Sequence, residues 1–342
     1  MKTKALLKAT SVVSLLAAGC ENPAPLAIDV PSAQFDLTNA LRTGWSEPVH
    51  LEPPINTSSA DQSPALSPDG LSLYFASDRP GSLGGVDLWV SRRASHHSAW
   101  ETPVNLGPGI NGSSIESGPN LSPDGHLLFF QSNRPGGQGS NDIYVARRND
   151  TDDDFGWGPP VNLGPDVNTT AAEVAPWYQQ RDADGPTLYF ARGPSNVFTD
   201  IYSVPITRHG HTRGPATFVA ELSTSEFNDG RMTLRADGRE IVFFSDRPGG
   251  LGVDLWTSTR RSVHDAWSRP VNLGSPPNSP DGDLLPALSR DGRTLLFTST
   301  RTGGLGGFDI WVSTRPLRED VGDDPDDNQA EERPGAHAGR RR

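Results

Sequence analysis

The apolar positions of this chain recur in short blocks, not at helical spacing. Each block holds four or five residues and is apolar nearly throughout, which is expected of a strand covered on both faces. An Asp-Gly pair, typical of a tight hairpin turn, precedes each block. The blocks are residues 71–75, 126–130, 187–190, 240–244 and 294–297, and the pairs are 69–70, 124–125, 184–185, 237–238 and 291–292. Each block therefore predicts the second strand of a β-hairpin.

The blocks belong to a long repeat that begins with tryptophan. Trp45, Trp100, Trp157 and Trp267 open copies that are 55, 57 and 110 residues apart. The last gap holds two copies, and Pro215 marks a degenerate opening between them. Five copies of one unit at a period near 55 residues indicate a solenoid or a propeller.

Proline positions predict the order of strands in each copy. The first copy offers four strands, at about residues 63–67, 71–77, 86–92 and 102–106. Proline lacks the backbone donor and is confined to edge strands. It recurs in the first strands (Pro64, Pro119, Pro176, Pro286) and in the fourth strands (Pro48, Pro103, Pro160, Pro215, Pro270). Each copy is therefore predicted to be a four-stranded propeller blade whose first strand lines the channel.

The two ends of the repeat predict how the ring closes. The repeat begins with a fourth strand at residues 45–51 and ends with a third strand at residues 308–315. The first segment should complete the last blade, which leaves only short, protected edges. We therefore predict an all-β, five-bladed β-propeller over residues 45–315. A sixth blade from residues 21–44 has no matching motif.

Composition agrees with this fold class and narrows the partners. Only 34% of residues are hydrophobic, and the chain has 36 Gly and 31 Pro, so turns are frequent. A net charge of −12 argues against nucleic acid and against an anionic membrane surface as partners. We expect a monomer.

The amino terminus has the features of an export signal. Lys2 and Lys4 precede an apolar run at residues 5–18, which is too short to span a bilayer, and small residues lead to Cys20. This end resembles a bacterial lipoprotein signal, and the resemblance implies cleavage after residue 19 and a lipid on Cys20, the only cysteine. Ala17 departs from the leucine that is commonest there; the alternative is an ordinary cleaved secretory signal. Lipid chains would hold the protein on a membrane.

The segments that flank the propeller are expected to have no core of their own. Residues 20–44 would be a tether, and the polar, charged residues 316–342 a disordered tail.

The repeat also resembles a known family. Ser-Pro-Asp-Gly at residues 67–70, Ser-Asp-Arg-Pro-Gly at 77–81 and Asp-Leu-Trp at 87–89 are similar to the TolB-like, WD-type propeller repeat of bacterial envelope proteins. The chain is most similar to the variety of this repeat with Asn-Leu-Gly between blades, as at residues 272–274, and that variety is often fused to OmpA-like domains. The resemblance implies that the protein binds another protein or a ligand in the cell envelope. It also implies a lipoprotein of the outer membrane that faces the periplasm or the surface.

A carboxylate recurs in the five loops that lead into the first strands. These residues are Asp61, Glu116, Glu173, Asp229 and Asp283, and four of them follow an asparagine by five residues (Asn56, Asn111, Asn168, Asn278). Because the first strands line the channel, we expect a ring of acids at its mouth. The ring is a candidate site for a calcium ion or for a basic or hydroxyl-rich ligand. Alternatively, each carboxylate caps backbone N–H groups of its own loop.

An arginine recurs in the loop between the second and third strands. Arg79, Arg134, Arg247 and Arg301 precede Asp87, Asp142, Asp254 and Asp309 by seven or eight residues. The third copy has Pro194 in place of the arginine but retains Asp200. We expect each arginine to pair with the following aspartate and fix the loop. A site for an anionic ligand is the alternative.

One aromatic residue departs from the repeat. Trp177 stands on a first strand where other copies have Ala, Asn or Thr, so it is a candidate for stacking on a ligand.

Catalytic motifs give little support for an enzyme. The chain contains no Gly-x-Ser-x-Gly and no His-Glu-x-x-His. The leading hypothesis is a non-catalytic propeller that binds an envelope protein or glycan through the face that bears Asp61. The alternative is a glycan-cleaving propeller that uses two channel carboxylates. No cofactor is expected, apart from the calcium ion considered above.

Overall fold

A computed structural model describes residues 44–196 and 198–316. The predicted export signal, Cys20, nearly all of the tether and the tail beyond Pro316 lie outside the described residues. In the described ranges the regular elements are all strands, and no helix there is long and apolar enough to cross a membrane.

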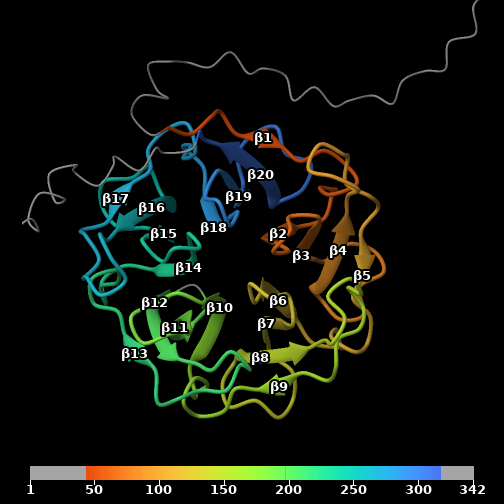
Figure 1. The fold of residues 1–342 in the computed structure, drawn as a ribbon. Coiled ribbons are helices and arrows are strands. Elements are labelled where there is room, and N and C mark those ends of the chain that lie inside the picture. Colours follow the sequence, from red (N-terminus) through yellow and green to blue (C-terminus); the bar gives the residue numbers. More distant parts are fainter. Residues whose placement is uncertain (1–43, 197, 317–342) are drawn as a thin grey trace, which may run out of the picture.

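Five four-stranded antiparallel sheets surround a central channel (Figure 1). The first four blades follow chain order: β2 (Asp61–Leu66), β3 (Ser72–Ser77), β4 (Asp87–Arg92), β5 (Val104–Asn105); β6 (Glu116–Leu121), β7 (Leu127–Ser132), β8 (Asp142–Arg147), β9 (Val161–Asn162); β10 (Ala172–Gln179), β11 (Thr187–Ser195), β12 (Phe198–Pro205), β13 (Thr217–Phe218); β14 (Asp229–Leu234), β15 (Glu240–Ser245), β16 (Asp254–Thr259), β17 (Val271–Asn272). The fifth blade holds β18 (Asp283–Leu288), β19 (Thr294–Ser299), β20 (Asp309–Thr314) and β1 (Val49–His50). The prediction of a five-bladed propeller is confirmed.

The ring closes where the start of the repeat meets its end. Strand β1 pairs with β20, with Val49 opposite Val312 and His50 opposite Trp311. The Ser46 N–H also donates to the Thr314 carbonyl at 2.7 Å. The last blade is therefore built from both ends of the propeller, as the order of strands predicted.

The hydrophobic core is divided among the five blade interfaces. Neighbouring residues of β3 face opposite ways: Tyr74 packs with residues of the second blade, and Phe75 with residues of the fifth. Both side chains are fully buried. The apolar blocks are thus second strands covered on both faces, and the first blade shares its hydrophobic core with its two neighbours.

The tryptophans that open the repeat lie under arginines that follow the third strands. The Arg315 guanidinium lies 4.4 Å from the Trp45 ring, and three further pairs have the same geometry at 4.2 to 4.5 Å. Those pairs are Arg93–Trp100, Arg148–Trp157 and Arg260–Trp267. Cation–π contact of this kind fixes the loop between third and fourth strands.

The propeller has two faces. We call the side with the first hairpin turns and the loops between third and fourth strands the turn face. The side with the loops between blades, and those between second and third strands, is the inter-blade face. Each inner strand runs from the inter-blade face to the turn face, so Asp61 and Leu66 lie at opposite ends of the channel wall.

Candidate functional site

The five repeated carboxylates lie at the start of the inner strands and are completely buried. Asp61, Glu116, Glu173, Asp229 and Asp283 each have 0% relative exposure. Asp61 accepts hydrogen bonds from the Thr57 N–H at 2.7 Å, the Thr57 hydroxyl at 2.8 Å and the Ser77 hydroxyl at 2.6 Å. The expected open ring at the channel mouth is therefore absent, because each carboxylate turns back onto its own loop.

The repeated arginines are bound to these carboxylates. Arg79 pairs with Asp61, and the equivalent pairs are Arg134–Glu116, Arg247–Asp229 and Arg301–Asp283, at 2.5 to 3.1 Å. This corrects the predicted partner, which was the aspartate that follows each arginine.

The following aspartates serve the loop itself. Asp87 accepts the Leu83 N–H at 2.6 Å and the Asn105 amide at 2.7 Å. Asp142, Asp254 and Asp309 accept backbone N–H donors of their own loops in the same way. These carboxylates thus hold the loop between the second and third strands by its backbone.

The third blade keeps the arginine at a different sequence position. Arg192 lies opposite Glu173 in the sheet, where the first blade has Ser77 opposite Asp61. Its Nε lies 2.9 Å from the Glu173 carboxylate, and its Nη2 donates to the Val167 carbonyl at 2.6 Å. The repeat places Pro194 at the arginine position of the third copy, so the sequence analysis did not predict Arg192 as the partner of Glu173. An arginine two residues before Pro194 was the sequence feature that could have indicated it.

Asp200 is the loop aspartate of the third blade. One of its carboxylate oxygens, like one of Asp254, is buried without a hydrogen-bond partner among the described residues. Burial and the neighbouring Asp229 raise the pKa of Asp200. Burial also raises the pKa of Asp229 by more than the bonds from Ser245 and Arg247 lower it. Two carboxyl groups with a raised pKa thus lie at this junction of the third and fourth blades.

The asparagines that precede the carboxylates tie neighbouring strands together. The Asn56 amide donates to the Ile310 carbonyl and accepts the Ile310 N–H, both at 2.8 Å. Asn111, Asn168 and Asn278 make the same two bonds to Leu88, Ile143 and Leu255. In the fourth blade the Ser223 hydroxyl accepts the Ile201 N–H instead.

No group of three or more His, Cys, Asp or Glu within residues 44–196 and 198–316 is arranged to hold a metal ion. Calcium takes six to eight oxygen ligands. The five inner carboxylates already accept bonds from an arginine, a hydroxyl or a backbone N–H, and they stand in five separate blades. Their geometry is that of loop caps.

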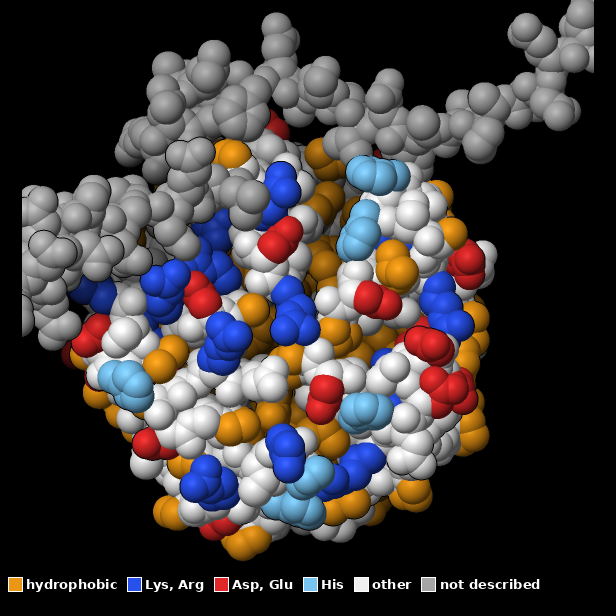
Figure 2. Space-filling view, in the orientation of Figure 1, with side chains coloured by type: hydrophobic (Ala, Val, Ile, Leu, Met, Phe, Trp, Pro, Cys, Tyr) orange, Lys and Arg blue, Asp and Glu red, His pale blue; other side chains and the backbone are white. Residues whose placement is uncertain are grey.

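A large hollow of the propeller opens on the turn face. A cavity of about 1830 Å³ enters the channel there and is lined by inner strands of all five blades. Its wall includes Ala65, Asn120, Trp177, Leu234 and Ala287. Figure 2 shows this hollow at the centre of the ring, with hydrophobic side chains inside it and Lys or Arg side chains around it.

Trp177 is the largest residue at its level of the wall. The equivalent positions carry Ala65, Asn120, Thr233 and Ala287. Trp177 is partly exposed, and its indole N–H has no hydrogen-bond partner among the described residues. The structure therefore brings this candidate into the cavity, which opens away from the five repeated carboxylates.

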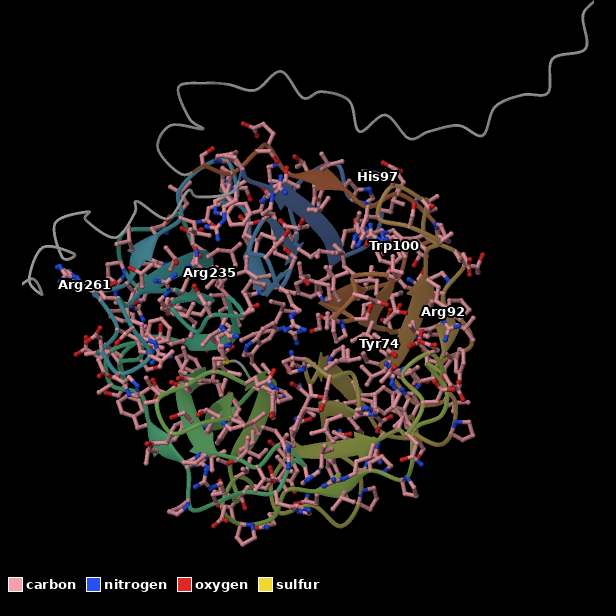
Figure 3. All side chains as sticks on the ribbon, viewed as in Figure 1. Tyr74, Arg92, His97, Trp100, Arg235 and Arg261 are labelled. Carbon is pink, nitrogen blue, oxygen red and sulfur yellow. The ribbon has the colours of Figure 1, made fainter. Side chains whose placement is uncertain are left out.

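The rim of the cavity is rich in arginine and histidine from turns and loops. Its members include Arg93, His96, His97, Arg181, Arg235, Arg290 and Arg293, and Figure 3 shows Arg235 and Trp100 on different sides of the channel. Three of the cavity carboxylates, Asp69, Asp237 and Asp291, belong to hairpin turns. Asp69 accepts the Ser67 hydroxyl at 2.5 Å, for example.

Asp237 is a rim carboxylate that is held ionised. Burial opposes its charge, but hydrogen bonds from Arg235 and Arg239 lower the pKa of Asp237 to about 2. The carboxylates of the hairpin turns thus shape those turns, while several arginines line the cavity.

Comparisons with known proteins identify the fold and no family. No family model and no curated protein matches this chain. A solved structure from Agrobacterium tumefaciens, provisionally named TolB, is 21% identical over 71% of each chain, with a TM-score of 0.43. An α-L-arabinofuranosidase from Lactobacillus brevis is 11% identical over 77% of this chain and 92% of its own, with a TM-score of 0.53. An endo-arabinase from Bacteroides thetaiotaomicron is 15% identical over 78% and 98%, with a TM-score of 0.50. The likeness to the arabinofuranosidase and the endo-arabinase supports the propeller fold alone.

Proposed function

We propose that this chain is a non-catalytic binding propeller of the bacterial cell envelope, and that its cavity on the turn face takes up a partner protein or an envelope glycan. The cavity is the observation that carries the proposal. At about 1830 Å³ it exceeds the size usual for a small-molecule pocket. It therefore suits an extended chain such as an oligosaccharide or a peptide segment.

The proposed face differs from the one favoured by the sequence. The inter-blade face bears the repeated carboxylates, but these are buried and committed to arginines and loop donors. The turn face offers an open hollow with one exceptional aromatic, Trp177, and a cationic rim. Aromatic rings and a few polar groups in a concave site are the usual features of ligand recognition.

The arrangement of carboxylates favours binding over hydrolysis. A glycosidase needs two carboxyl groups flanking the bond, one of them with a raised pKa. The carboxylates that line the cavity are Glu47, Glu52, Asp69, Asp237 and Asp291, on the amino-terminal segment and three separate turns. The likeness to arabinan-degrading enzymes is compatible with catalysis but supports only the fold, so turnover belongs in the test.

Membrane attachment is part of the proposal. A lipid on Cys20 would hold the propeller at a membrane, with residues 21–44 as the tether. Labelling with radioactive palmitate, compared between the full chain and Cys20→Ser, tests this part separately. Incorporation that survives the substitution would remove the lipid anchor from the account.

The binding test compares two aromatic residues on opposite faces. Trp177→Ala removes the cavity aromatic, and Phe198→Ala removes an aromatic that is 61% exposed on the inter-blade face. Each variant is passed over an array of envelope glycans and used to capture proteins from envelope extract. We expect Trp177→Ala to weaken retention of the bound species at least tenfold and Phe198→Ala to leave it unchanged.

Two outcomes would contradict the proposal. Loss of binding in Phe198→Ala alone would move the site to the inter-blade face. Release of sugars from arabinan by the wild-type chain, abolished by substitution of a single carboxylate, would make the protein an enzyme.

A further inference from the structure

Arg231 is a buried cation without an anionic partner. It lies on β14 with 5% relative exposure, and its Nη2 donates to the Pro64 carbonyl at 3.1 Å. Two other arginines are equally buried, and both have carboxylates: Arg79 binds Asp61, and Arg148 binds Asp154. Within the described residues Arg231 has no ion pair. Arginine carries five N–H donors, so a single bond to a carbonyl leaves most of them unused.

The repeat does not require a cation at this position. The equivalent residues of the other inner strands are Ser63, Gly118, Ala175 and Leu285. Burial lowers the pKa of Arg231 to about 9, as expected for a charge removed from water without a partner. A buried, uncompensated charge destabilises the fold, so its presence needs another explanation.

The guanidinium lies directly beneath the cavity. Arg231 belongs to the fourth blade and Pro64 to the first, which are not neighbours, so the side chain crosses the channel. Pro64 immediately precedes Ala65, which lines the cavity. A Cβ atom added to Gly118 would stand 3.3 Å from the Arg231 Nη1, and Gly118 lies two residues before the wall residue Asn120. Arg231 thus crosses the channel on the inter-blade side of the wall residues Ala65 and Asn120.

A second arginine crosses the mouth. Arg290 lies in the first hairpin turn of the fifth blade, and its Nη1 donates to the Pro123 carbonyl of the second blade at 3.1 Å. It is exposed, lines the cavity and has no ion pair in the part of the chain that the structure describes. One cation with no ion pair among the described residues therefore stands at the entrance of the cavity, and another crosses the channel beyond the wall residues of the cavity.

We infer that the cavity recognises a carboxylate on an extended ligand, with Arg231 as the buried receptor and Arg290 as the group that meets the ligand at the mouth. A guanidinium matches a carboxylate in charge and offers two parallel N–H donors. The carboxylate replaces the Pro64 carbonyl as the acceptor of Arg231 and supplies the missing counter-charge. This inference rests on the proposed function, because it specifies the ligand of the same cavity.

The experiment measures binding of charged and neutral forms of two ligands to the full chain by titration calorimetry. One pair is hexagalacturonate and its methyl ester. The other is a hexapeptide with a free carboxyl terminus and its amide. The two pairs distinguish an acidic glycan from a peptide as the source of the carboxylate. We expect one acidic probe to bind at least tenfold more tightly than its neutral form, or about 1.4 kcal/mol.

Variants of Arg231 test whether its guanidinium causes this preference for the acidic form. Arg231→Met keeps the length of the side chain without its charge, and it should reduce the acid preference to less than twofold. Arg231→Lys keeps the charge but lacks the planar guanidinium, so it should retain only part of the preference for the acidic probe. Arg261→Met, at an exposed arginine outside the cavity, is the matched control and should leave the preference unchanged.

The failures of this inference and of the proposed function are distinguishable. Equal binding of acidic and neutral forms, with loss of both in Trp177→Ala, would overturn the carboxylate and retain the binding cavity. An acid preference that persists in Arg231→Met, or no binding of either acidic probe, would also overturn the inference. A lower melting temperature of Arg231→Met with unchanged selectivity would make Arg231 a structural crosslink.

Discussion

Removal of Arg79 tests whether the repeated carboxylates are structural. Asp61 is completely buried, and the Arg79 side chain is only 8% exposed. Arg79→Met leaves the Asp61 carboxylate with the Thr57 and Ser77 donors but without a counter-charge. Breaking a buried pair on one side costs about 3–5 kcal/mol. We therefore expect the free energy of unfolding to fall by about 3 kcal/mol.

The equivalent change in the second blade is the internal comparison. The Arg134 side chain is 22% exposed, so solvent can partly replace it, and Arg134→Met should cost less than Arg79→Met. Asp61→Asn combined with Arg79→Met should recover part of the loss, because no charge then remains buried. Urea unfolding measures all three variants, with the slope checked for constancy. A change below about 0.5 kcal/mol for Arg79→Met, with loss of ligand binding, would refute the structural role.

Three further predictions concern closure, acid stability and the channel arginine. Trp45 is 1% exposed beneath Arg315, so Trp45→Ala should lower the free energy of unfolding by about 3–5 kcal/mol, measured by thermal unfolding. Trp100 is only half-buried, so Trp100→Ala should lower it less. Equal effects of the two substitutions would contradict the predicted role of Trp45 in closing the ring. Although burial opposes it, hydrogen bonds from Tyr74, Arg148 and Arg92 lower the pKa of Asp154. The ionised Asp154 carboxylate therefore stabilises the fold above the unfolded pKa of about 3.9, and this stabilisation is lost as the pH falls further. Asp154→Asn should be less stable than wild type at pH 7, and the difference in free energy of unfolding should be smaller at pH 3. Arg231→Met should raise the melting temperature at pH 7, because replacing a buried charge by an apolar group is often stabilising. Burial lowers the folded pKa of Arg231 to about 9. The destabilisation caused by its buried charge is therefore complete below that pH and decreases above it. The difference in melting temperature between Arg231→Met and wild type should accordingly be smaller at pH 10 than at pH 7.

The architecture was predictable because each blade repeats the same local signals. The apolar blocks and Asp-Gly pairs define the central hairpins, and proline defines the edges. The closure followed from the order of strands, which the pairing of Val49 with Val312 confirms. Repetition averages out local exceptions, so the fold could be read without knowledge of any single contact.

The pairing of side chains was not predictable in the same way. Arg79 lies eight residues before Asp87 and 18 residues after Asp61, yet it binds Asp61 because the hairpin register places Asp61 opposite Ser77. Sequence separation favoured the nearer aspartate. Arg192 was missed because it reaches the same carboxylate position from a different register.

The location of the cavity depends on packing that the repeat does not encode. Which end of a channel is open is decided by the size and reach of individual side chains. Trp177 was singled out because it breaks the repeat. Arg231 was not, because the equivalent positions share no residue type and no pattern there marks an arginine as exceptional.

The central claim is that ligand enters the channel from the turn face. Photo-crosslinking tests it most directly, with p-benzoylphenylalanine placed at position 177 in one full-length chain and at position 198 in another, and both chains exposed to envelope extract. We expect adducts from position 177 that excess ligand suppresses, and none from position 198. Adducts from position 198 alone would contradict it.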